Sequence, residues 1–271
     1  MKRALISLLA LSALLVSTHA FAGDTTELLD QGAIEVDPAF TIDNIHDGKP
    51  AVASEIGIVY GVLDGFNIGA GVSFASEEGM NFGSAALNLN ALATPLDTDH
   101  VDVDVAVDFD FDFSSGYSLT PSFELNYDLE PDLALWGLYL KFGLPIYGSL
   151  VGIDEDTAAA MGADTKELKG ADVGISLSLG TYYTINEIHQ IVVEGGFEVN
   201  NLAENMGETV VEAGYLSLGY NVVVNDSFEL TTELAFNIPS QDKNVDEEFN
   251  CALSIGGIFT IGGGASSAEV E

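Results

Sequence analysis

Strict alternation of apolar and acidic residues marks the stretch from Val101 to Phe113. It reads VDVDVAVDFDFDF, so valine and phenylalanine hold the odd positions and aspartate holds all but one of the even positions. A period of two places alternate side chains on opposite faces of a β-strand, whereas an amphipathic helix repeats its apolar residues every three or four positions. At about 3.3 Å per residue, such a strand extends for about 40 Å, roughly twice the usual length in soluble sheets. The pattern predicts a long strand with one apolar and one acidic face, able to cross a bilayer at a tilt.

The same alternation recurs along the chain, for example from Phe66 to Ala75, from Asp172 to Leu179 and from Phe228 to Asn237. In each segment, apolar residues alternate with small or polar ones. The pattern predicts about twelve strands, an even number. Their approximate ranges are 33–43, 51–63, 66–75, 80–94, 99–113, 117–129, 133–147, 170–183, 188–199, 208–223, 227–238 and 248–261.

One apolar segment, Ala134 to Ile153, has a single charge and resembles a helical span. Lys141, Pro145 and four glycines argue against a helix, and the segment alternates as the others do, so a strand is predicted there. Without a spanning helix, a closed barrel is the remaining way to pair every backbone group within lipid. The predicted fold class is therefore all-β: a closed antiparallel transmembrane β-barrel of about twelve strands, connected as an up-and-down meander.

The lengths of the connections support this topology. Outer-membrane barrels have short periplasmic turns and longer outer loops, so their connection lengths alternate along the chain. The predicted outer connections are 44–50, 76–79, 114–116, 148–169, 200–207 and 239–247. The predicted inner turns are 64–65, 95–98, 130–132, 184–187 and 224–226. The longest connection, 148–169, is interpreted as a surface loop, with a lid folded into the pore as the alternative.

The amino terminus has the features of a secretory leader. Met1, Lys2 and Arg3 precede an apolar run from Ala4 to Val16, and small residues before Gly23 fit a cleavage site. We expect a signal peptide at 1–22, an outer-membrane barrel at 23–262 and a disordered carboxyl-terminal tail at 263–271. The expected location is the outer membrane of a Gram-negative bacterium.

Aromatic residues lie near the ends of many predicted strands, where girdles form at the two membrane interfaces. These residues are Tyr60, Phe66, Phe74, Tyr117, Tyr127, Tyr147, Tyr182, Tyr183 and Phe228. The chain ends in GGGASSAEVE, without the terminal aromatic strand typical of such barrels, and Phe259 and Ile261 are the candidates for that role.

The chain is strongly acidic, with 43 Asp and Glu against 7 Lys and Arg, a formal net charge of −36. Removing a leader that contains Lys2 and Arg3 would take this charge to −38. Such a protein repels nucleic acids and anionic surfaces. Cys251 is the only cysteine, so no intrachain disulfide can form.

The acidic face of the long strand is predicted to face the interior of the barrel. A turn at 114–116 would pair Asp112 with Ser118 and Asp104 with Asn126. Aspartates about 7 Å apart on one face repel by ~2.4 kcal/mol at an effective dielectric of 20. The interior must therefore hold water and counter-ions, or some of its carboxyl groups must be protonated.

Lys141 is the one basic residue found in the predicted strands, and its parity points it inward. Glu124 lies within one or two ladder positions of it, so an ion pair is predicted. We interpret Lys141 as a brace, with a role in the pore constriction as the alternative. The predicted lumen-lining residues are Asp102, Asp104, Asp108, Asp110, Asp112, Glu124, Asp128, Lys141, Glu194, Glu198, Glu229 and Glu233.

Catalytic and metal-binding patterns are weak. His46, His100 and His189 follow the leader, with no H-E-x-x-H motif and no histidine and cysteine cluster. No catalytic residue, cofactor or resident metal is predicted, and we expect that the protein is not an enzyme. The acidic runs 154–156 and 246–248 offer oxygen ligands for calcium, but are interpreted as solvated loops.

The leader, the alternating strands and the loop asymmetry together resemble the porin-like outer-membrane barrels of about twelve strands, including the group named for the MetA pathway of phenol degradation. This resemblance implies passage of small solutes but identifies no functional residue. The leading hypothesis is a passive porin-like channel whose acidic lumen favours cations.

Two alternatives are a non-conducting structural or divalent-cation-binding surface barrel and a secreted acidic β-sandwich. The expected partners of the leading hypothesis are outer-membrane lipids, small cations or small solutes and the outer-membrane assembly machinery, with no nucleic acid.

Overall fold

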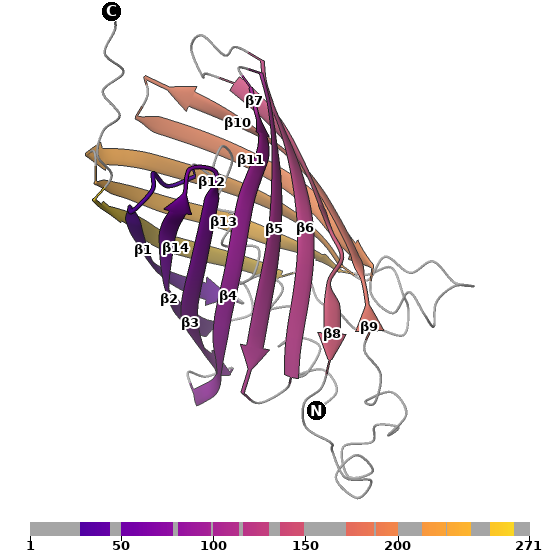
Figure 1. Ribbon diagram of the computed structural model, residues 1–271. Coiled ribbons are helices and arrows are strands. Elements are labelled where there is room, and N and C mark those ends of the chain that lie inside the picture. The colour runs from indigo at the N-terminus through magenta and orange to yellow at the C-terminus, as the bar shows by residue number, and fades with distance from the viewer. Residues whose placement is uncertain are drawn as a thin grey trace, which may run out of the picture.

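The computed structural model describes residues 28–43, 50–77, 81–98, 100–113, 116–129, 136–148, 172–186, 188–199, 213–225, 227–239 and 250–262. These residues form a single barrel-shaped sheet (Figure 1). Its strands are β1 (Ile34–Asp43), β2 (Ala51–Leu63), β3 (Phe66–Glu77), β4 (Asn81–Asp97), β5 (Val101–Asp112), β6 (Gly116–Asp128), β7 (Trp136–Gly143), β8 (Ile146–Gly148), β9 (Asp172–Val173), β10 (Ile175–Ile185), β11 (His189–Val199), β12 (Ala213–Asn225), β13 (Phe228–Pro239) and β14 (Asn250–Ile261).

Two of the barrel strands are each divided into two segments. Leu144 and Pro145 separate β7 from β8, and Gly174 separates β9 from β10. The two halves of each divided strand continue the same ladders, because β6 pairs with both β7 and β8, and β8 pairs with β9 just as β7 pairs with β10. Pro145 has no N–H to donate, which explains an interruption here. The fourteen segments therefore make twelve barrel strands.

The sheet closes on itself between its first and last strands. β1 pairs antiparallel with both β2 and β14, and each other barrel strand pairs with its two sequence neighbours. The predicted closed antiparallel meander of twelve strands is confirmed. The alternative of a β-sandwich is wrong, because a single closed sheet replaces two stacked ones.

The connections divide into two sets, as predicted. One end of the barrel, here called the turn end, has the connections 64–65, 98–100, 129–135, 186–188 and 226–227. The opposite end, the loop end, has the connections 44–50, 78–80, 113–115, 149–171, 200–212 and 240–249. The first strand begins and the last strand ends at the turn end, which faces the upper left of Figure 1. The leader, the tail, most of the longest loop, His46 and both acidic runs lie outside the described residues.

The predicted register between β5 and β6 is wrong by two residues. Asp112 pairs with Gly116, Asp104 with Glu124 and Asp102 with Asn126. The chain therefore reverses over 113–115 instead of 114–116. A slip of two keeps every side chain on its predicted face, since the side-chain period of a strand is two. Matching of polar faces consequently could not distinguish the two registers.

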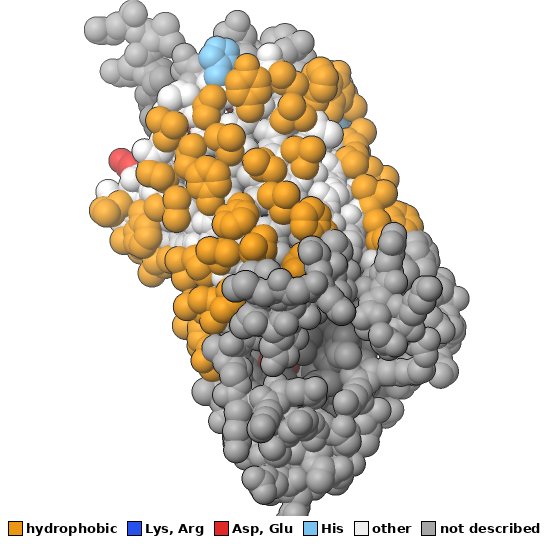
Figure 2. Space-filling view, turned by 90° about the vertical axis from the view of Figure 1, so that its right-hand side faces the viewer, with side chains coloured by type: hydrophobic (Ala, Val, Ile, Leu, Met, Phe, Trp, Pro, Cys, Tyr) orange, Lys and Arg blue, Asp and Glu red, His pale blue; other side chains and the backbone are white. Residues whose placement is uncertain are grey.

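The outward face of the barrel is apolar and the inward face is polar, the reverse of a soluble protein. Ile58 is 52% exposed and Leu218 is 48% exposed, whereas Asp104 is 3% and Thr231 is 1% exposed. Hydrophobic side chains spread over the described face visible in Figure 2. In the described ranges, no helix has the length and apolar character needed to cross a membrane.

The prediction that strand-end aromatics form outward girdles is only partly right. Tyr60, Tyr127 and Tyr183 are exposed on the outer face, at 42%, 46% and 50%. Tyr182 is 2% exposed and points inward, where its hydroxyl donates to Asp128. Tyr147 also turns inward and donates to Glu198. Their hydroxyls find carboxylate partners inside the barrel, which explains why they leave the interface.

Candidate functional site

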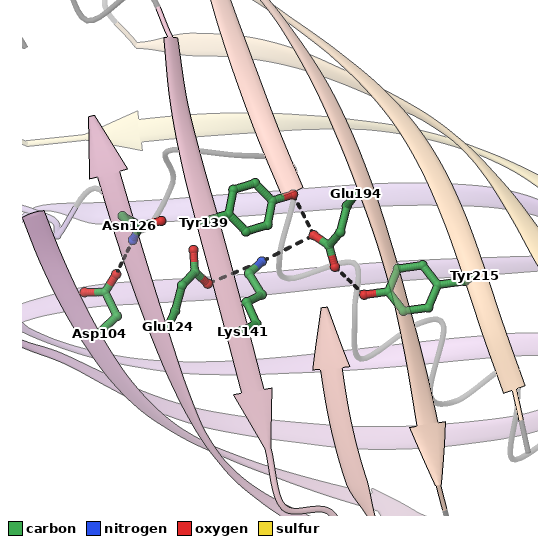
Figure 3. A network of polar contacts seen from close by, with 7 residues as sticks. All are labelled: Asp104, Glu124, Asn126, Tyr139, Lys141, Glu194 and Tyr215. Carbon is green, nitrogen blue, oxygen red and sulfur yellow. Dashed lines mark hydrogen bonds and ion pairs between the residues drawn. The ribbon is translucent and has the colours of Figure 1, made fainter. Parts of the chain in front are cut away.

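The inward face of the described barrel is lined with carboxylates on several strands. The twelve predicted lumen-lining residues all lie in described strands and have inward parity. Asp104, Glu124, Lys141 and Glu194 come together in one network of polar contacts, which Figure 3 shows together with Asn126, Tyr139 and Tyr215. The others lie around this network on the same face.

An ion-pair triad forms the centre of the network. Lys141 on β7 lies directly opposite Glu124 on β6, with 3.3 Å between Nζ and Oε2. The same ammonium lies 3.7 Å from Oε2 of Glu194 on β11 and 4.9 Å from the centre of the Tyr139 ring. The predicted ion pair between Glu124 and Lys141 is confirmed. Glu194 is the second partner of Lys141. The two residues are far apart in the sequence, so the sequence alone did not indicate this contact.

Glu194 is held by side chains from two other strands, β7 and β12. Tyr139 on β7 donates to its Oε2 over 2.7 Å, and Tyr215 on β12 donates to its Oε1. Figure 3 shows the two rings approaching the carboxylate from opposite sides. Glu194 is only 6% exposed, so both oxygens need partners to offset lost hydration. Its charge is therefore fixed in place by two hydroxyls and an ammonium.

Glycines opposite the inward tyrosines make this geometry possible. Tyr139 pairs with Gly180, where an added Cβ would stand 2.0 Å from the ring Cζ. Tyr182 similarly lies over Gly137, at 2.1 Å. Tyr215 lies over Gly196, at 2.7 Å from Cε1. Each ring therefore lies flat over the neighbouring strand, and its hydroxyl reaches a more distant carboxylate.

The aspartates of β5 are held by neutral donors. Asn126 donates to Oδ2 of Asp104 over 3.0 Å, and Thr94 donates to Oδ1. Asp110 accepts from Asn88 over 2.9 Å and from Ser118 over 3.1 Å. Amide and hydroxyl donors position a carboxylate without neutralising its charge. These contacts therefore fix the positions of the two carboxyl groups without bringing a cation to them.

The remaining predicted residues lie outside the central network. Asp128 and Glu198 accept from Tyr182 and Tyr147, and Asp102 accepts from the backbone N–H of Thr98 over 3.2 Å at the turn end. Asp108, Asp112, Glu229 and Glu233 share the inward face on β5 and β13.

Further acids on this face of the described strands are absent from the sequence prediction. They include Glu35, Asp37 and Asp43 on β1, Glu55 on β2 and Asp97 on β4, which pairs with Asp102. Part of the signal was present, because Ile34 to Asp43 also has a period of two, with acids at three of its five inward positions and Ala39 and Thr41 at the other two. Glu55 is 7% exposed, and its Oε1 lies 3.5 Å from the position of an added Cβ at Gly71.

The inner wall is uneven in side-chain size. β2 and β3 present small inward residues, whereas β6 to β12 contribute the tyrosines, glutamates and lysine of the network. The small inward residues are Ala51, Ala53, Gly57, Gly61, Gly69, Gly71, Ser73 and Ala75.

Lys141 is the only Lys or Arg among the described residues. Its side chain keeps 21% of its surface accessible although it points inward. Space for water therefore exists inside the barrel beside the network.

The described residues contain no group of three His, Cys, Asp or Glu suited to hold a metal. His189 lies on the outer face, where its ring stacks on Tyr220 and Nδ1 lies 2.9 Å from the Tyr220 hydroxyl. His100 lies at the turn end. The geometry joins neither histidine to the acidic network.

Comparisons with known proteins identify the fold. No model of a protein family matches the chain, and no curated protein matches it. The KdgM porin aligns with a TM-score of 0.58 at 9% identity, covering 84% of this chain and 99% of that chain. The NanC porin aligns with a TM-score of 0.58 at 11% identity, covering 83% and 98%. An outer-membrane channel from Pseudomonas putida F1 reaches 0.61 at 10% identity, covering 88% and 100%.

The chain has the fold of the twelve-stranded porin-like outer-membrane barrels. This agrees with the resemblance drawn from the sequence. At these identities the likeness concerns the fold, so selectivity must be argued from this chain's own inner wall.

Proposed function

We propose that this protein is a passive diffusion channel of the Gram-negative outer membrane and that it favours small cations. The observation that carries the proposal is the charge of the inner wall. Acidic side chains occupy the inward faces of β1, β2, β5, β6, β11 and β13, against the single ammonium of Lys141 in the described residues. Charges of one sign in a low-dielectric cleft concentrate counter-ions. Outer-membrane lipids and the outer-membrane assembly machinery are the partners that this location implies.

Two parts of the wall have different roles in this proposal. The network of Glu124, Lys141 and Glu194 places one ammonium between two carboxylates, so its charge is partly compensated, and it braces the wall. On β5, Asp108, Asp110 and Asp112 are half-buried, so permeating cations would meet their carboxylates. Neighbouring carboxylates about 7 Å apart repel by ~2.4 kcal/mol at a dielectric of 20, a cost that mobile cations relieve. Lys141 would narrow the permeation path, but its single positive charge would not make the net charge of the inner wall positive.

A contrast with one structural neighbour sharpens the proposal. A KdgM porin structure contains disordered oligogalacturonate and aligns with this chain at a TM-score of 0.58 and 8% identity. Oligogalacturonate is a polyanion, and the acidic inner wall of this chain would repel it. Small cations and neutral polar solutes are therefore the favoured classes.

Planar-bilayer recording of the purified protein tests the channel. Under a potassium chloride gradient, the reversal potential should have the sign that marks preference for potassium over chloride. This preference for cations should weaken at high ionic strength, because salt screens the carboxylates. Anion preference would overturn the assignment of selectivity. No conductance from a correctly folded barrel would favour the structural alternative, and calcium titration by calorimetry would then test its acidic loops.

A further inference from the structure

The chain folds back on itself immediately before β1. Residues 28–33, here called the N-terminal strap, end in a turn in which the Ala33 N–H donates to the Asp30 carbonyl over 2.9 Å. Gly32 occupies the turn with a φ of +88°, a conformation that glycine adopts without strain. The residues before the turn consequently run back beside the first strands.

Three hydrogen bonds fix the strap to the turn end of β2. The Gly32 N–H donates to the Gly61 carbonyl over 2.8 Å, and the Gly61 N–H donates to the Ala33 carbonyl over 3.0 Å. The Gln31 side chain donates to the Val62 carbonyl over 3.3 Å. The strap is therefore tied to the barrel wall.

The strap lies on the inner side of that wall. Gly61 has inward parity, since its neighbour Tyr60 is 42% exposed outside. A Cβ added at Gly61 would stand 2.3 Å from the Asp30 carbonyl oxygen and 2.8 Å from that of Leu29. Strap backbone thus occupies the space of an inward side chain at position 61.

Burial around Gly61 agrees with this placement. Leu29 is 9% exposed and Ala33 is 1% exposed. Asn67, which pairs with Gly61 across β2 and β3, is 4% exposed. At Gly137, Gly180 and Gly196, by contrast, a tyrosine side chain from the paired strand fills the recess. At Gly61 the space left by the missing side chain is filled by backbone of the N-terminal strap. The strap itself therefore lies in the lumen.

We propose that the N-terminal strap forms a constriction at the turn end that sets the size limit for permeating solutes. This inference rests on the proposed channel function. Channel selectivity depends on pore diameter as well as on charge, and a segment against the inner wall reduces the open cross-section. Small hydrated cations pass beside the strap, and larger solutes are excluded there.

The test is Gly61→Val, which removes the recess without changing charge. Displacement of the strap should raise single-channel conductance about twofold and admit larger polyethylene glycols, while the reversal potential changes little. Gly195→Ala is the matched control, because its Cβ would meet its nearest neighbour at an ordinary 3.6 Å. A second variant that deletes residues 24–31 tests the same constriction if Gly61→Val folds poorly.

The outcomes separate the strap from the channel itself. Variants that conduct better than wild type, or conduct where wild type is closed, support the constriction. Unchanged conductance and an unchanged polyethylene glycol cut-off in folded variants would overturn the strap inference and leave the channel standing. No conductance in wild type and in every folded variant would overturn both.

Discussion

Tyr139 faces Gly180 across the β7–β10 pair, and its ring fills the space where a Cβ of Gly180 would stand. The missing side chain on one strand determines the direction of the tyrosine on the next, and so brings its hydroxyl to Glu194. A residue with no side chain thereby helps to fix the buried charge of Glu194, which pairs with Gly180 on the next strand, β11.

Substitution of Gly180 by alanine should therefore destabilise the barrel. The new Cβ would displace the Tyr139 ring and break its hydrogen bond to Glu194, at a cost of about 2–4 kcal/mol from overpacking and the lost charged hydrogen bond. Urea unfolding in lipid vesicles measures the change. Gly195→Ala on the outer face is the control, and equal stability of the two variants would contradict this account.

Tyr182 and Tyr183 are adjacent tyrosines on opposite faces of one strand. Tyr182→Phe removes the hydroxyl that donates to Asp128 and should cost about 1.5–3 kcal/mol of unfolding free energy, the range for a hydrogen bond to a charged group. Tyr183→Phe, at an exposed outward site, should change stability by less than about 0.5 kcal/mol. If Tyr183→Phe lost more unfolding free energy than Tyr182→Phe, the inward hydrogen bond to Asp128 would not be the source of the stabilisation.

Lys141 is expected to hold its part of the wall together. Lys141→Met leaves Glu124 and Glu194 close together without their cation, and should cost about 3 kcal/mol. Adding Glu194→Gln to Lys141→Met should recover part of this loss by removing one of the two charges. Equilibrium unfolding measures the free energy of unfolding of the single and double variants. If the effects of the two substitutions simply add, the proposed coupling between Lys141 and Glu194 is refuted.

Much of the fold follows from the period-two alternation. A strand such as Val101–Asp112 exposes its period directly, and this pattern predicts twelve closed strands, their parity and an inward Lys141 beside Glu124. The register of β5 and β6 does not follow, because a slip of two residues matches polar faces equally well. The observed pairing of Asp112 with Gly116 distinguishes the two registers, and a hydrophobic pattern contains no information about it.

The inward tyrosines show a second limit of sequence reasoning. Tyr182 and Tyr183 both lie near a strand end, where either could join an interfacial girdle. The distinguishing facts are the glycine across the ladder from Tyr182 and the carboxylate beyond it. Both depend on strand pairing, so Gly137 and Asp128 acquire meaning only once the register is known.

The aspartates of β5 provide the sharpest test of the channel. Asp108→Asn with Asp110→Asn keeps size and polarity. At position 110, Asn88 can still donate to the amide oxygen, and the Ser118 hydroxyl, which donates to the other carboxylate oxygen in the wild type, can accept from the amide NH2 instead. Both positions are half-buried, so the barrel should fold with stability within about 1 kcal/mol of wild type. Two negative charges leave the inner wall, so the reversal potential in a salt gradient should shift towards zero.

Asp104→Asn is the informative companion to that double variant. Both oxygens of Asp104 accept hydrogen bonds, from Thr94 and Asn126, and the residue is 3% exposed. Replacing this carboxylate with an amide weakens both charge-assisted hydrogen bonds and forces one of the two donors to accept instead. At a buried site water cannot compensate, so this variant should lose about 1–3 kcal/mol of stability. It should affect selectivity less than the double variant, because buried Asp104 is less accessible to passing ions. An unchanged reversal potential in a conducting Asp108→Asn, Asp110→Asn protein would show that cations pass elsewhere in the lumen.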